Sequence, residues 1–295
     1  NPTTTNRKNL QAKFDLAATK SHANYSFYTG ASNTNIDEIK QLDNTLACRL
    51  KVFMVASTGD MLVDNQDTLE AIFREAPVNI VTHCEDTPTI IENEKAIIAQ
   101  YGEDIDARFH PRIRDAASCL KSSQLAYDLA TKHGSNLHIL HLTTADEMKL
   151  FTEGEITGKK ITAEVCVHHL FFSEADYETR GNFIKCNPSV KSEQDRLALI
   201  DAVQKNKIDI IATDHAPHTL EEKQQPYLQA PSGLPLNQHS LLVLLDFYNK
   251  GIFTLEQIVQ KTSHNIAERF QIKDRGYIRE GSFADLVIVD LSANT

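Results

Sequence analysis

The chain has 295 residues, a formal net charge of −10 and a hydrophobic fraction of 41%. This length suffices for one large α/β domain or two ordinary ones, and the hydrophobic fraction is typical of globular proteins. The acidic balance argues against nucleic acid or an anionic membrane as a partner, and no apolar stretch is as long as a membrane span. The five cysteines are scattered without a CxxC pair, which indicates a reducing compartment that we expect to be the cytoplasm.

Six short apolar runs along the chain predict β-strands. Longer stretches with apolar residues at helical spacing lie between them, such as 68–74, 114–132 and 193–206. Alternation of strand and helix predicts βαβ units and a parallel sheet. The predicted strands are residues 25–30, 50–55, 78–83, 137–142, 161–167 and 208–212.

A single series of six βα units favours an α/β fold of the (β/α)8 TIM-barrel type over a doubly wound sheet. A complete barrel has eight units, so we expect this chain to lack the first two, with residues 7–20 as the helix of the second. A turn-rich stretch over 276–285 and an apolar run over 286–290 predict the edge of a small β domain. The predicted division is therefore an incomplete barrel over 1–270 and the start of the small domain over 271–295.

Polar side chains recur near the carboxyl ends of the predicted strands. Side chains alternate between the two faces of a strand. We therefore expect each of His83, His141 and Asp214 to lie on the same face of its own strand as the residues two and four positions before it. Lys51 lies deeper, and its long stem can reach the mouth of the barrel. Each residue alone has an ordinary structural explanation, but two imidazoles and a carboxylate that converge on one lumen suit Zn²⁺ or a similar divalent metal.

Several segments resemble the cyclic amidohydrolases of the amidohydrolase superfamily, and among these the dihydroorotases of the long bacterial type match best. The most specific is Thr-Asp-His-Ala-Pro-His at 213–218, which hydantoinases and allantoinases usually alter in its second half. Lys-Val-Phe-Met at 51–54 resembles the family segment whose lysine is carboxylated. Further similar segments are 81–86, 138–142, 187–188, 230–233 and 281–286.

The resemblance implies reversible, metal-dependent hydrolysis of dihydroorotate to N-carbamoyl-aspartate, a reaction of pyrimidine biosynthesis. It implies two Zn²⁺ ions per site, bridged by a carboxylated Lys51, with His83 and His141 holding the inner ion. Asp214 would bind the other ion and act as the general base.

The resemblance also implies which residues contact the substrate, a small molecule. They are Asn187, His218 and the backbone near Gly233. Neither nucleic acid nor membrane is expected as a partner. The protein partner that we expect is a second copy of the chain, in a homodimer. The adjacent His168 and His169 are expected to be structural, or to contact the metal ligands without binding the metal. We expect Cys166 to behave as a small hydrophobe, because no base pairs with it in the sequence.

One departure from the family pattern leaves alternatives open. The family binds its more exposed metal with a His-x-His pair on the first strand, and no such pair occurs in these 295 residues. Its place lies upstream of Asn1, so either a longer parent protein carries the pair or part of the site is absent, and we expect residues 1–295 alone to lack useful activity. The alternatives are a cyclic amidohydrolase of the dihydropyrimidinase or hydantoinase type, and a catalytically inactive scaffold.

Overall fold

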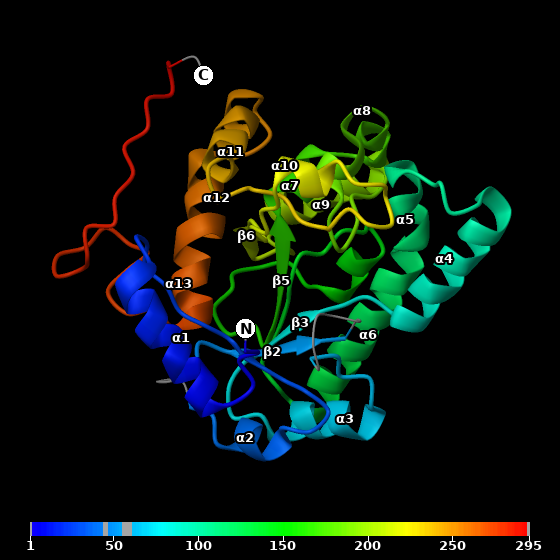
Figure 1. The fold of residues 1–295 in the computed structure, drawn as a ribbon. Helices are drawn as coiled ribbons and strands as arrows, with labels where there is room; N and C mark the ends of the chain where they lie inside the picture. The colour runs from blue at the N-terminus through cyan, green and yellow to red at the C-terminus, as the bar shows by residue number, and fades with distance from the viewer. Residues whose placement is uncertain (1, 44–46, 55–60, 294–295) are drawn as a thin grey trace.

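Six parallel strands, hydrogen-bonded in chain order, form the centre of the computed structural model, which describes residues 2–43, 47–54 and 61–293 (Figure 1). The chain order and the parallel pairing are those of a (β/α) barrel, and they confirm the predicted TIM-barrel-like fold. Within the described ranges no pairing joins β6 to β1, so the sheet is open between these two strands. The strands are β1 Thr29–Gly30, β2 Leu50–Phe53, β3 Ile80–His83, β4 Leu137–Ile139, β5 Ile161–Cys166 and β6 Ile210–Ala212.

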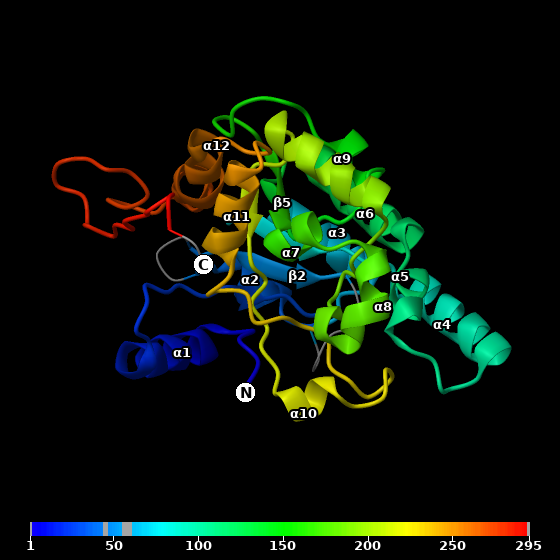
Figure 2. The ribbon, with the colours of Figure 1, turned by 90° about the horizontal axis from the view of Figure 1, so that it is seen from above.

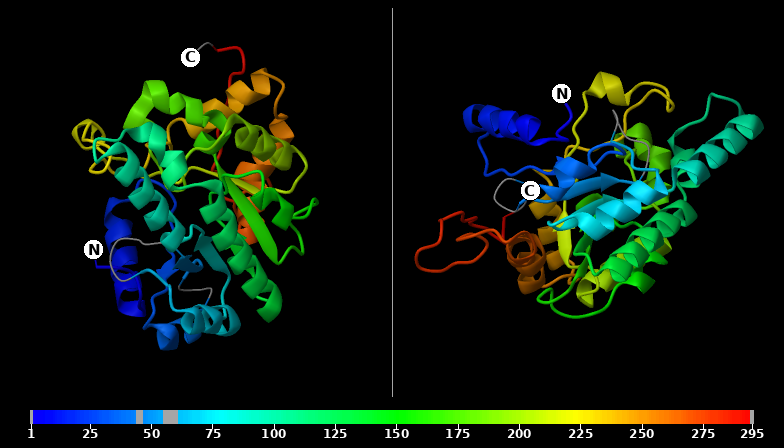
Figure 3. Two further views of the ribbon diagram at one scale, coloured as in Figure 1. Left: turned by 90° about the vertical axis from the view of Figure 1, so that its right-hand side faces the viewer. Right: turned by 90° about the horizontal axis from the view of Figure 1, so that it is seen from below.

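Helices cover the outside of the curled sheet (Figure 3). Three of the longer ones begin where Asn65, Asp86 and Asp115 each accept a hydrogen bond from the backbone N–H three residues later, as N-cap side chains do. The helices expected from residue spacing are confirmed, including the one over residues 7–20. The helices are α1 Arg7–Lys20, α2 Ile36–Lys40, α3 Gln66–Glu75, α4 Thr87–Tyr101, α5 His110–Ile113, α6 Ala116–His133, α7 Val167–Phe171, α8 Tyr177–Arg180, α9 Glu193–Gln204, α10 Leu220–Lys223, α11 Ser240–Asn249, α12 Leu255–Val259 and α13 Asn265–Phe270.

The hydrophobic core lies between the strands and the helices. Outward-facing strand residues such as Leu50, Ile80 and Leu137 are fully buried there, together with Ile72 and Phe73 of α3. At roughly 1.5–3 kcal/mol for each large buried apolar side chain, this layer is the main source of stability. It fixes the strands in register, so the side chains at their carboxyl ends are held at one rim. Across the described residues, none of the helices has the length and apolarity needed to cross a bilayer.

The first predicted strand is wrong for residues 25–28. Only Thr29–Gly30 joins the sheet, whereas Tyr25 and Phe27 pack against Phe14 of α1. The ring centroids of Phe14 and Phe27 lie 5.0 Å apart. Aromatic residues favour strands because they pack well on a half-buried surface, and here the helix provides that surface instead.

The apolar run at 286–290 forms no strand in the described part of the chain. Its side chains are exposed, with Ile288 98% accessible. A strand is stable only when neighbouring strands satisfy its backbone, and none of the described residues pairs with this run. Figures 1 and 2 show the segment, in red, leaving the barrel. The small β domain over 271–295 therefore stays a prediction.

Candidate active site

Two imidazole rings meet at the carboxyl ends of β3 and β4. The ring centroids of His83 and His141 lie 4.4 Å apart, with an angle of 73° between the ring planes. His83 donates its Nε2 proton to Glu85 Oε2 at 2.8 Å, which leaves the lone pair on Nδ1. His141 Nδ1 is buried, and among the described residues it has no hydrogen-bond partner. Burial lowers the pKa of both rings, so both present neutral nitrogens that can bind a metal.

The direction of the His141 ring does not follow from the alternation of side chains along β4. The strand register pairs Val81, which lies on the same face as His83, with His138, so His138 is the inward residue of β4. Leu137 packs outward in the core, and the expected common face of Leu137 and His141 is therefore wrong. Strand β4 ends at residue 139, and His141 has a φ of +36°, which turns its ring toward His83.

Lys51 and Asp214 are electrostatically coupled to each other and to this pair of rings. Burial lowers the pKa of Lys51 to about 8, although the charges of Asp214 and Glu164 partly oppose that shift. Partial desolvation raises the pKa of Asp214, while the charges of Lys51 and His83 oppose this. Asp214 follows β6 with a φ of +46° and is accessible to solvent at the mouth of the barrel. The four side chains thus come from β2, β3 and the segments that follow β4 and β6.

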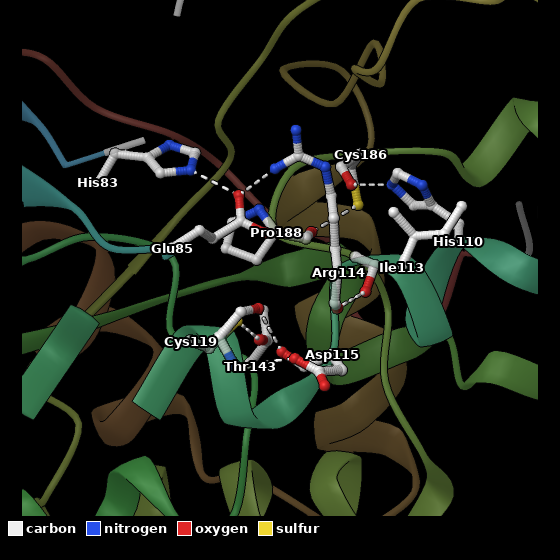
Figure 4. A network of polar contacts seen from close by, with 12 residues as sticks. His83, Glu85, His110, Ile113, Arg114, Asp115, Cys119, Thr143, Cys186 and Pro188 are labelled. Atoms are coloured by element: carbon white, nitrogen blue, oxygen red, sulfur yellow. Dashed lines mark hydrogen bonds and ion pairs between the residues drawn. The ribbon is translucent and has the colours of Figure 1, made fainter. Parts of the chain in front are cut away.

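A buried ion pair holds His83 in place (Figure 4). Oε2 of Glu85 accepts both the His83 bond and a 2.6 Å bond from Arg114 Nη1, and the Glu85 side chain is fully buried. Burial alone would raise the pKa of this carboxyl, but Arg114 and the His83 hydrogen bond outweigh it and lower the pKa to about 2. Glu85 is therefore ionised at neutral pH and fixes both the tautomer and the orientation of the His83 ring.

The loop that contains Gly233 packs closely against the segment after β6. Gly233 has a φ of +143°, and a Cβ atom there would lie 2.4 Å from the carbonyl oxygen of Ala216. The ammonium group of Lys223 donates to the Gly233 carbonyl at 3.0 Å. His218 Nε2 lies 3.3 Å from the Ser232 carbonyl oxygen. The structure therefore brings two of the predicted substrate-contacting elements, Gly233 and His218, together.

Asn187 directly follows two residues whose carbonyl groups are held by hydrogen bonds. The Lys185 carbonyl accepts a 2.8 Å bond from the Gly233 N–H, and His110 Nε2 lies 2.8 Å from the Cys186 carbonyl oxygen (Figure 4). Within the described ranges the side-chain oxygen of Asn187 is buried without a partner. An unpaired buried acceptor costs about 1–3 kcal/mol, and a bound donor would relieve that cost.

Comparison with known proteins agrees with this geometry. The Amidohydrolase family profile matches residues 6–295. The chain belongs to the amidohydrolase family. This amidohydrolase is similar to the dihydroorotase of Methanosarcina mazei, with 29% identity over 300 residues that cover 98% of the chain and 65% of that relative. It is 36% identical over 230 residues to the dihydroorotase of Halalkalibacterium halodurans, which covers 76% of the chain and 52% of the relative.

A solved structure supports the same fold for this amidohydrolase. L-hydantoinase (dihydropyrimidinase) from Arthrobacter aurescens superposes with a TM-score of 0.88 at 25% identity, over 96% of this chain and 64% of the other. The chain spans between about half and two thirds of the length of these relatives. The resemblance expected from the sequence motifs is confirmed.

The donor set fits a divalent metal, and the amidohydrolase family is generally metal-dependent. The fit rests on two imidazoles that keep a free lone pair in a buried position and on a carboxylate coupled to them. Neutral imidazole and ionised carboxylate are the forms that Zn²⁺ and similar ions bind. The structure does not bring Asn187 into a hydrogen bond with any of these groups within the described ranges.

Sequence reasoning missed two residues of this amidohydrolase site. Glu85 lies only two positions after His83. A carboxylate so close to a histidine at the end of a strand could have been predicted to hydrogen-bond to the ring and fix its orientation. Arg114 lies 29 positions after Glu85, and no local pattern links the two. Only the fold could reveal that pair.

Proposed function

We propose that this amidohydrolase catalyses reversible hydrolysis of a cyclic amide bond, with dihydroorotate as substrate and N-carbamoyl-aspartate as product. The observation that carries the proposal is the meeting of His83 and His141, with Lys51 and Asp214 coupled to them, at the carboxyl ends of the strands. Active sites of (β/α) barrels lie at that end. Dihydroorotases are the relatives that support this choice of substrate.

Lys51, His83 and His141 would hold one metal ion and Asp214 would bind a second, and we propose that both are Zn²⁺. When bound, the metals would lower the pKa of water and polarise the ring carbonyl. A neutral lysine is a poor bridging ligand, so Lys51 would first be carboxylated by CO₂, which reacts with the uncharged amine. With a pKa of about 8, about a tenth of Lys51 is uncharged at pH 7. Burial of Lys51 thus favours its carboxylation.

Asp214 would move the proton during the reaction. Its carboxylate would accept a proton from the attacking water and return it to the amide nitrogen as the ring opens. His218 and the backbone around Gly233 would orient the substrate, because the His218 ring contacts the residue before Gly233, and Gly233 packs against the segment that follows Asp214. Glu85 and Arg114 would keep the His83 ring in the required tautomer.

The test is a substrate comparison with the natural protein, loaded with Zn²⁺ in bicarbonate buffer. L-Dihydroorotate, 5,6-dihydrouracil and hydantoin are assayed in parallel, with the Asp214→Asn variant as background. We expect kcat/KM to be highest for dihydroorotate. A preference for dihydrouracil or hydantoin would support the second candidate, a dihydropyrimidinase or hydantoinase, which the likeness to the Arthrobacter aurescens enzyme favours. No turnover of any of the three by the metal-loaded protein would contradict both and favour an inactive scaffold.

A further inference from the structure

Three side chains of types that bind metals gather at the end of β5, beside the candidate active site, where Cys166 interacts electrostatically with Lys51. Cys166 is the last residue of β5, and His168 and His169 follow it in the first turn of α7. The Cys166 sulfur and one ring nitrogen from each histidine all lie within 4.8 Å of one another. All three residues are buried, with at most 3% of each exposed. Ligand atoms about 2.0–2.3 Å from one tetrahedral ion stand roughly 3–4 Å apart, so small side-chain rotations would suffice.

The hydrogen bonding of the two histidines does not fit a purely structural role. Both ring nitrogens of His168 are buried, and neither has a partner among the described residues. His169 donates Nε2 to the Pro188 carbonyl at 3.1 Å, and its Nδ1 is buried without a partner in the same part of the chain. Buried polar groups are normally paired, and each unpaired one costs about 1–3 kcal/mol. A histidine that donates one nitrogen to a carbonyl and keeps the other free is typical of a metal ligand.

We propose that Cys166, His168 and His169 form a second metal site, which binds a zinc-like divalent ion through one thiolate and two neutral imidazoles. On binding, the Cys166 S–H bond breaks, the sulfur keeps the electron pair that it donates to the ion, and the proton passes to solvent. Three protein ligands leave one coordination position for water. The ion fastens the end of β5 to the first turn of α7.

This site uses none of the residues assigned to the catalytic metal. Those residues lie on β2 and β3 and after β4 and β6, whereas all three ligands here lie within residues 166–169. Of the three ligands, His168 lines a cavity of about 590 Å³, together with Phe183 and Leu236 among others. The donor types differ as well, because only this cluster offers sulfur. That difference allows each site to be detected separately.

The test uses Co²⁺ as a spectroscopic probe in the natural protein. A Co²⁺–thiolate bond gives a near-ultraviolet charge-transfer band, which the nitrogen and oxygen ligands of the catalytic site cannot produce. We expect this band in the wild type and in His141→Asn. In Cys166→Ser we expect the band to be absent and the protein to bind one equivalent of metal less than the wild type. Cys48→Ser and Cys119→Ser are the matched controls, and both should keep the band.

A second measurement needs no variant and covers the case in which Cys166→Ser fails to fold. Zinc-edge X-ray absorption of the zinc-loaded wild type should show a sulfur neighbour at about 2.3 Å. A wild type without the Co²⁺ band would overturn the proposal, as would a zinc environment of nitrogen and oxygen alone. Persistence of the band in a folded Cys166→Ser variant would assign it to another thiol and would also overturn it.

Discussion

Replacing Glu85 with Gln tests how the buried ion pair supports both the fold and the site. Glu85→Gln keeps the size of the side chain and removes the negative charge that Arg114 and His83 share. The Arg114 guanidinium is then left largely buried beside an uncharged amide. Removing one partner of a buried pair costs about 3–5 kcal/mol in proteins, mainly because the remaining charge is uncompensated.

The pKa of Glu85 gives an independent magnitude. It falls from an ordinary value of 4.5 to about 2 in the folded protein, so ionised Glu85 stabilises the fold by about 3 kcal/mol at neutral pH. Because the folded pKa is the lower one, this stabilisation is complete well above pH 4.5 and disappears as the pH falls toward 2. By pH 3 we expect less than half of it to remain.

The assay is urea denaturation followed by circular dichroism, at pH values from 8 to 3. We expect Glu85→Gln to lower the free energy of unfolding by about 3 kcal/mol between pH 8 and 5.5, with the difference from wild type shrinking below pH 4.5. The control is Glu75→Gln, which breaks an exposed pair with Arg74 and should leave the midpoint unchanged. A loss below about 1 kcal/mol would refute the reasoning. So would a difference that changes between pH 6 and 8, since His83 would then be the titrating group.

Further predictions concern catalysis, the substrate loop and the metal. Asp214→Asn should lower kcat by about 10²–10⁴-fold with an unchanged circular dichroism spectrum, and turnover within a few-fold of wild type would place the base elsewhere. Gly233→Ala should destabilise the fold by about 1–3 kcal/mol in thermal melts, because its Cβ would meet the Ala216 carbonyl. Gly154→Ala has a positive φ but open space around it, so an equal loss there would exclude the close contact as the cause. A purified protein of residues 1–295, supplied with Zn²⁺ and bicarbonate, should hydrolyse dihydroorotate far more slowly than a dihydroorotase that carries a His-x-His pair, and comparable rates would mean that the pair is dispensable.

The strands of the barrel could be predicted from the sequence to within a few residues. A parallel sheet covered by helices buries both faces of its strands, so they appear as nearly continuous apolar runs. The runs at 50–55, 78–83 and 161–167 each contain the observed strand. The run at 286–290 has the same composition but no strand beside it in the described part of the chain, and composition alone cannot provide one.

The sequence predicts which strand ends carry the site residues better than it predicts how their side chains are oriented and paired. His83 was expected from alternation, and β3 does extend to it. His141 lies past the end of β4, where alternation no longer holds and a positive φ sets the direction of the ring. Glu85 and Arg114 meet only because α5 and the segment after it fold over the end of β3. Such a contact depends on tertiary packing and leaves no periodic trace in the sequence.

The central claim is that His83 and His141 bind one metal ion together with Lys51 at the carboxyl end of the barrel. The most direct test is an anomalous difference map from crystals of the natural protein grown with Zn²⁺ and bicarbonate. The account predicts a peak about 2.0–2.1 Å from a ring nitrogen of each histidine, with density for a carboxyl group bonded to Lys51 Nζ as a carbamate. A fully loaded protein with no peak between the two rings, or with Lys51 unmodified and pointing away from the ion, would contradict it.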